Sequence, residues 1–185
     1  MILSLTLFVH VVGMVTLFVG LGLEWASLDG LQRSTTRDQA LSWLLLAVMV
    51  PRVSGIAVAA IVVSGFYLGG RFGVLGTDWM RASYGALLLM AIVSGPVSRS
   101  AMRMLKRVAS SPAGGPELTA QAAASSPILW LSLRLRIAFG LAVVFLMIAK
   151  PDAGESLLVL VLASVATIVT SFTRRTAPSA AAHAR

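Results

Sequence analysis

The chain has 185 residues, of which 57% are hydrophobic and only 12% are charged, and its formal net charge is +8. Soluble domains usually have about 25% charged residues, so this chain has too few to cover a globule with polar surface. The composition therefore excludes an ordinary soluble domain and predicts a protein that is solvated by lipid, in which each span needs about 20 apolar residues.

Apolar runs separated by polar segments predict an all-α transmembrane bundle. The first run lacks the basic start of a signal peptide, so we expect it to be retained as a helix. The second run is interrupted by Pro51; we favour one kinked, continuous helix over a separate interfacial helix that ends there. Residues 1–173 then form one bundle, followed by a disordered basic tail at 174–185. The five predicted spans are residues 2–23, 41–70, 79–98, 127–149 and 155–173.

The basic residues predict how the bundle is oriented. With five spans, one side of the membrane receives nine lysines and arginines and the other receives three, namely Arg71, Arg81 and Lys150. The basic side faces the cytoplasm in most membrane proteins, so we expect an outside N-terminus and a cytoplasmic C-terminus in a bacterial inner membrane. The same charges suit anionic lipid headgroups and do not indicate nucleic-acid binding. The nine residues are Arg33, Arg37, Arg99, Arg103, Lys106, Arg107, Arg174, Arg175 and Arg185.

A single histidine, His10, lies within a predicted span. Ionisable groups in spans usually face protein or a cavity, and imidazole is a ligand for haem and for metals. The functional interpretation is a haem, porphyrin or metal ligand or a proton relay, and the structural one is an interhelical hydrogen bond. The chain has no cysteine, which excludes thiolate metal sites and c-type haem attachment.

One histidine cannot supply both axial ligands of a haem within one chain. The second ligand would be a methionine, a water molecule, or His10 of a second protomer. Met90 has a predicted depth similar to that of His10, although a methionine in an apolar helix usually fills the core.

Four charged residues fall near the predicted inner leaflet. Arg134 and Arg136 are two positions apart, so they point about 200° apart on a helix and cannot both face one partner. We expect one of them to pair with Glu24 while the other reaches the headgroups. Arg52 and Arg134 could instead form a cationic pocket for a carboxylate or a propionate.

Several short motifs resemble known membrane families. F-V-H-V-V-G-M-V lies in the first span and is followed by G-L-G-L-E-W, and V-V-S-G-F-Y-L ends the second span. D-W-M-R stands at the start of the third, and F-L-M-I-A-K-P closes the fourth. Over residues 5–151 the chain resembles a bacterial family of predicted integral membrane proteins of unknown function. More distantly it is similar to the HemJ-type protoporphyrinogen oxidases and the CopD-type copper-resistance membrane proteins. The HemJ resemblance implies that His10 is the haem-associated histidine. The lysine that HemJ proteins use in a later span has no match here, where Arg81 stands in the third span.

Three functional hypotheses remain open, and whether any reaction occurs is open too. The first is a membrane protein that binds haem, porphyrin or another small ligand through His10. The second is a non-catalytic subunit or scaffold, whose glycines pack against a partner or a second copy. The third is a small transporter or metal-handling protein.

Overall fold

The computed structural model describes residues 1–110 and 124–176, and within them the chain is entirely helical. These described residues contain the five predicted helices in the predicted order. They are α1 (Ile2–Arg33), α2 (Arg37–Phe72), α3 (Asp78–Ser110), α5 (Pro127–Ala149) and α6 (Ala153–Thr176).

Local sequence signals set several of the helix ends. The hydroxyl of Thr36 accepts a hydrogen bond from the backbone N–H of Gln39 and thereby caps the start of α2. Gly73 ends α2 in the left-handed conformation, with φ of 68°, which glycine adopts without a Cβ clash. Pro127 begins α5, where its missing N–H is not needed. Lys150 ends α5 with φ of 50°, and Pro151 follows it.

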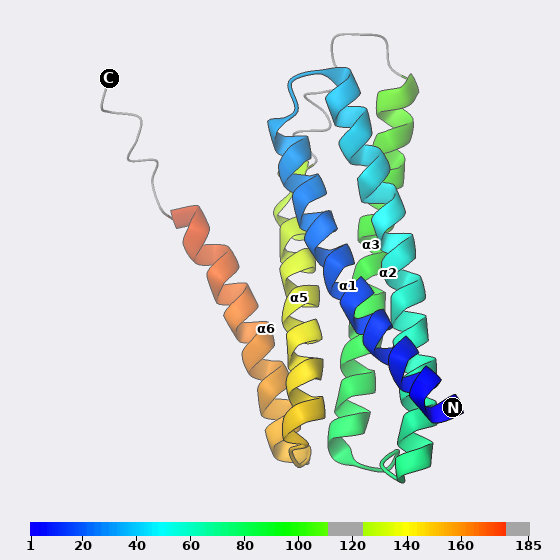
Figure 1. The fold of residues 1–185 in the computed structure, drawn as a ribbon. Helices are drawn as coiled ribbons and strands as arrows, with labels where there is room; N and C mark the ends of the chain where they lie inside the picture. Colours follow the sequence, from blue (N-terminus) through cyan, green and yellow to red (C-terminus); the bar gives the residue numbers. More distant parts are fainter. Residues whose placement is uncertain (111–123, 177–185) are drawn as a thin grey trace.

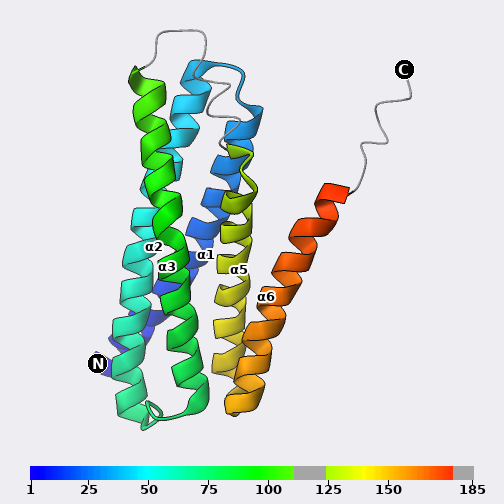
Figure 2. The same cartoon turned by 180° about the vertical axis from the view of Figure 1, so that it is seen from behind.

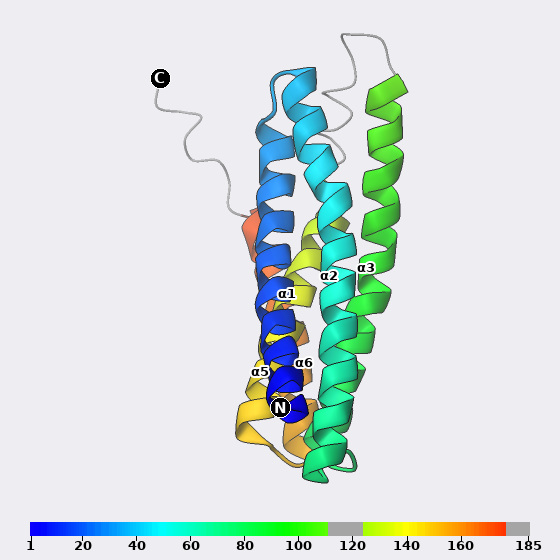
Figure 3. The same ribbon diagram turned by 45° about the vertical axis from the view of Figure 1, so that its right-hand side comes forward.

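Four helices form the body of the molecule, and the fifth lies along one edge. α1, α2, α3 and α5 run side by side, whereas α6 packs against α5 near their short connection and leans away from it towards its C-terminal end (Figures 1 and 2). The N-terminus, the α2–α3 connection and the α5–α6 connection lie at one end of the bundle (Figure 1). The turned view in Figure 3 places α1 and α2 next to each other along their whole length.

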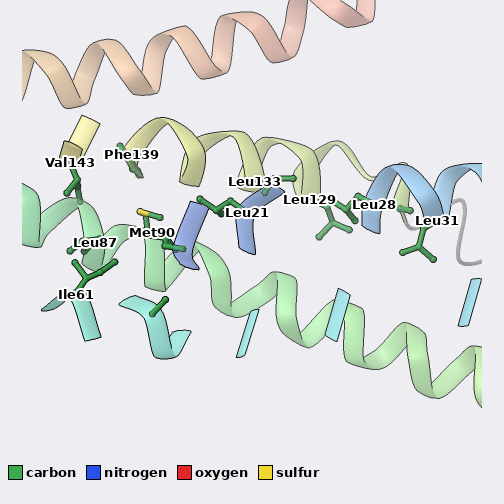
Figure 4. Packing of buried hydrophobic residues seen from close by; sticks show 14 of the residues in the cluster. Leu21, Leu28, Leu31, Ile61, Leu87, Met90, Leu129, Leu133, Phe139 and Val143 are labelled. Carbon is green, nitrogen blue, oxygen red and sulfur yellow. The ribbon is translucent and has the colours of Figure 1, made fainter. Parts of the chain in front are cut away.

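The core follows the long axis of the bundle. Figure 4 shows it extending from Ile61, Leu87, Met90 and Val143 to Leu28, Leu31 and Leu129, with Leu21 and Leu133 between them. The outer faces are apolar as well: Ile56, Val63, Ile128 and Ile148 are each more than 70% exposed. Large apolar side chains on the outside are costly in water and suit a lipid surrounding.

Four of the helices in the described part of the chain are long and apolar enough to cross a membrane. These are α1, α2, α5 and the Ala153–Ser171 part of α6. The sequence predicted five spans, but α3 is not among the four.

Helix boundaries agree with the predicted spans to different degrees. α5 has the predicted bounds, and α2 continues through Pro51 as one helix. α1 extends ten residues past its predicted end at 23, because Ser27, Leu28 and Leu31 are still buried on one of its faces. α3 continues to Ser110, and α6 continues to Thr176, into the first residues of the predicted tail. The rest of that tail, 177–185, lies outside the described residues.

Candidate functional sites in the bundle

His10 makes a hydrogen bond between two helices. Its Nδ1 lies 3.0 Å from the Oγ of Ser64 on α2. The Ser64 hydroxyl in turn donates to the carbonyl oxygen of Ala60 at 2.5 Å. A serine has one hydrogen to donate, so we assign the proton of the neutral imidazole to Nδ1, which donates to Ser64. The other ring nitrogen, Nε2, is then unprotonated.

A third helix approaches the same place through Tyr84 of α3. A Cβ added to Gly65 would lie 3.2 Å from His10 Cε1 and 3.7 Å from the Tyr84 hydroxyl oxygen. That hydroxyl is buried and has no hydrogen-bond partner among the described residues. His10, Ser64 and Tyr84, which we call the histidine cluster, therefore gather polar atoms from α1, α2 and α3 around one glycine.

Glu24 of α1 and Arg136 of α5 form a buried ion pair. Arg136 Nη1 donates to Glu24 Oε2 at 2.8 Å, and Nη2 donates to Glu24 Oε1. Each side chain is only 3% exposed. The Arg136 Nε also donates to the carbonyl oxygen of Ser132, at 3.3 Å. The two hydrogen bonds between Arg136 and Glu24 form a bidentate pair, the arrangement that gives arginine–carboxylate pairs their strength and directionality.

A cavity of about 230 Å³ lies beside this ion pair, between α1, α2, α3 and α5. Arg136 lines it together with Ser54, whose buried Oγ has no hydrogen-bond partner among the described residues. Leu17, Leu21 and Met90 line its apolar side. We call this space the Arg136 cavity.

The four residues predicted to bind a cofactor lie in different environments. His10 belongs to the histidine cluster, and Met90 lines the Arg136 cavity. Arg52 is exposed on α2. Arg134 is half-buried and donates to Ser171 Oγ on α6 at 3.3 Å. The structure thus does not bring these four residues together into one pocket.

The histidine cluster and the Arg136 cavity lie at different heights in the bundle. On α3, Tyr84 of the cluster and Met90 of the cavity are six residues apart, which is about 9 Å along a helix axis. On α2, Ser64 and Val58 have the same spacing, and Val58 lines the cavity. Met90 is therefore not placed opposite His10, where a second axial ligand would lie.

The described residues contain no group of three or more His, Cys, Asp or Glu side chains that could hold a metal ion. A metal bound through His10 would therefore need ligands of another kind, such as a macrocycle.

Sequence reasoning missed Ser54, Ser64 and Tyr84, and it left open which arginine pairs with Glu24. The missed residues share one signal, because each is a polar side chain inside an apolar run. Such residues usually face the bundle interior. Residues with hydroxyl groups are common in spans, so this signal did not distinguish Ser54, Ser64 and Tyr84 from the other hydroxyl residues of the chain.

With four apolar helices of spanning length and a core that contains ionic and polar groups, the chain is a helical integral membrane protein. Comparisons with models of protein families, with curated proteins and with solved structures find no match. The resemblance to HemJ-type and CopD-type proteins therefore rests on the short motifs alone.

Proposed function

We propose that this is a bacterial inner-membrane protein that binds haem or a related porphyrin through Nε2 of His10. The contact between His10 Nδ1 and Ser64 Oγ, at 3.0 Å, is the observation on which this proposal rests. Histidines that ligate metals usually donate the proton of their other ring nitrogen to a neighbouring acceptor, which fixes the ring orientation. Ser64 supplies such an acceptor to His10.

The surroundings of His10 fit an imidazole ligand in two further respects. The Tyr84 hydroxyl is a buried polar group without a described partner next to the ring, and a bound group could accept its hydrogen bond. The exposed residues of α1 beside His10, such as Phe8 and Val11, are apolar, so lipid rather than water should surround the bundle at this depth. A haem held there would supply one-electron chemistry.

Met90 lies at a different height in the bundle from His10, which affects the choice of the second axial ligand. Of the candidates that the sequence left open, a water molecule or His10 of a second protomer suits the geometry better than Met90. In this proposal Arg52 and Arg134 do not hold propionates. Ser64 lies twelve residues from Arg52, about 18 Å along α2, and Arg134 is bonded to α6.

The proposal includes an orientation in the membrane. We place the N-terminus outside and let α3 cross as a fifth span, since it lies between α2 and α5 in the bundle (Figure 2). This arrangement places the α1–α2 connection, with Arg33 and Arg37, in the cytoplasm next to anionic headgroups.

The test is an absorption spectrum of the purified protein, oxidised and reduced, after expression with ample haem. We expect a Soret band that disappears in His10→Ala and weakens in Ser64→Ala, while the folded fraction stays the same by gel filtration. Ser42→Ala is the matched control, because the Ser42 hydroxyl bonds only within its own helix. A colourless wild-type protein that also fails to take up added haem would contradict the proposal.

A scaffold or subunit role is the second candidate, and the open glycines favour it. A Cβ added to Gly13 would lie 3.0 Å from Ile61 Cγ1, so this glycine packs α1 against α2 within the chain. Gly22 and Gly55 have no atom within 4 Å of an added Cβ. They leave small surfaces on which a partner helix or a second copy could pack. Purification of a colourless protein with a stoichiometric partner would support this role, and Gly22→Leu should then release that partner.

A further inference from the structure

The Arg136 cavity combines apolar walls with unused hydrogen-bond donors. A guanidinium has five N–H hydrogens, and the described residues engage three of those of Arg136, through Ser132 and the two Glu24 oxygens. Two N–H hydrogens remain on a side chain that lines the cavity. The buried Oγ of Ser54 lies in the same wall without a described partner.

Buried polar groups in native proteins almost always have a partner, whether protein, water or ligand. Here the unused groups on Arg136 are donors, and the Ser54 hydroxyl can donate as well. An occupant that satisfies them must present acceptor oxygens. The Glu24–Arg136 pair is neutral as a whole, so an additional carboxylate would leave an uncompensated buried charge, which is costly. A neutral carbonyl oxygen fits the donors without that cost.

The volume sets the size of the occupant. At about 230 Å³, the cavity is smaller than the pockets of about 300–1,000 Å³ that hold drug-sized ligands. An apolar cavity of about 150 Å³ is known to hold a benzene ring. The Arg136 cavity therefore has room for one ring with small substituents, and it is too small for a porphyrin.

The position of the opening indicates where such a molecule comes from. Gly55 on α2 and Ala91 on α3 line the cavity and are both exposed. Ile56 and Ile92, which follow them in the chain, are more than 60% exposed. Apolar side chains of the kind that faces lipid thus flank the opening, with the exposed Arg52 about one turn away on α2, so a ligand would reach the cavity from the bilayer.

We propose that the Arg136 cavity is a binding site for a small, neutral, lipid-soluble molecule with one ring and a carbonyl oxygen. The oxygen accepts hydrogen bonds from Arg136 and Ser54, and the ring packs against Leu17, Leu21 and Met90. Glu24 holds the guanidinium in position for this contact. The site is separate from the histidine cluster, so the proposal does not depend on haem binding at His10.

The test compares two probes that differ in the carbonyl group. We would titrate 4-fluoroacetophenone and 4-fluorotoluene into the full-length protein in detergent and follow the fluorine NMR signal. We expect saturable binding of the ketone, about tenfold tighter than that of the toluene, because only the ketone can accept from the charged guanidinium. Empty micelles give the signal for partition into detergent.

Two leucine variants locate the binding. Gly55→Leu should abolish the saturable signal, since its side chain enters open space beside the cavity without meeting another atom at Cβ. Gly22→Leu, with equally open space but no position in the cavity wall, should bind like the wild type. Saturable binding that survives in Gly55→Leu overturns the site. No saturable binding to the wild type overturns the proposal, and equal affinity for the two probes overturns the role of Arg136.

Discussion

Glu24 and Arg136, 112 positions apart in the chain, form the ion pair that joins α1 to α5 inside the bundle. Both side chains are almost completely buried. The rings of Trp25 and Trp130 make a second contact between these helices, and Arg136 lines the Arg136 cavity. The rotation of α5 that turns Arg136 towards Glu24 also brings Arg136 to the Arg136 cavity.

Removing one partner of this pair should destabilise the protein strongly. Arg136→Leu leaves the Glu24 carboxylate buried without its counter-charge, and such losses typically cost about 3–5 kcal/mol. The double variant Glu24→Leu/Arg136→Leu should recover most of this loss, because no unpaired charge remains. Unfolding of the purified protein by increasing sodium dodecyl sulfate, followed by circular dichroism, measures both.

Arg134→Leu is the matched control for this experiment. Arg134 lies on the same helix but is half-buried and makes one hydrogen bond, to Ser171 Oγ at 3.3 Å. Its loss should cost about 1 kcal/mol. A cost for Arg136→Leu no larger than that for Arg134→Leu would show that the Glu24–Arg136 pair does not hold the bundle together.

The choice between these two arginines illustrates what the sequence could predict. Apolar run lengths identified every helix, and Pro127 and Lys150-Pro151 marked both ends of α5. Glu24 was expected to pair with Arg134 or Arg136, but the two point to different sides of α5. Which of them faces Glu24 depends on the rotation of α5, and that is set by packing of the whole bundle rather than by local sequence.

The end of α1 was mispredicted for a related reason. Apolar residues become sparse after Leu23, and the prediction therefore ended the span there. The helix continues because Leu28 and Leu31 pack into the core. The hydroxyls of Ser27 and Ser34 donate hydrogen bonds to nearby backbone carbonyl oxygens, so these polar residues are accommodated there. A single buried face is enough to continue α1 for these ten residues past the apolar region, but a count of apolar residues does not detect it.

Gly30 should tolerate no side chain. A Cβ at this position would overlap the indole ring of Trp43 on α2, with Cζ2 only 2.8 Å away. The rigid ring would have to move as a unit, so Gly30→Ala should cost about 1–3 kcal/mol, as overpacking does. Thermal unfolding in detergent provides the measurement.

Gly22→Ala is the control: nothing lies within 4 Å of its added Cβ, so the better helix propensity of alanine should leave stability unchanged or raised by up to about 1 kcal/mol. Equal losses in the two variants would contradict the packing of α1 on Trp43.

The hydrogen bond to Ser64 predicts the tautomer of His10. With the Ser64 hydroxyl donating to Ala60, the neutral imidazole should have its proton on Nδ1. Nitrogen NMR of protein labelled at histidine should show a protonated Nδ1 and an unprotonated Nε2 for His10, at a pH where the ring is neutral. In Ser64→Ala the acceptor is lost, and the signals should move towards a mixture of both tautomers. His10 found with its proton on Nε2 in the wild type would remove the main support for an Nε2 ligand.

The absence of cysteine makes the proposed orientation directly testable. Thr35, between α1 and α2, and Gly76, between α2 and α3, are both exposed and lie at opposite ends of the bundle (Figure 1). In whole cells with a permeable outer envelope, a membrane-impermeant maleimide should label Gly76→Cys and leave Thr35→Cys unlabelled. After lysis both should react, which controls for the accessibility of each site. The positive-inside distribution predicts this result because Arg33 and Arg37 flank Thr35 and are held in the cytoplasm. Labelling of Thr35→Cys but not Gly76→Cys in intact cells would invert the orientation and place the Glu24–Arg136 pair nearer the outer leaflet.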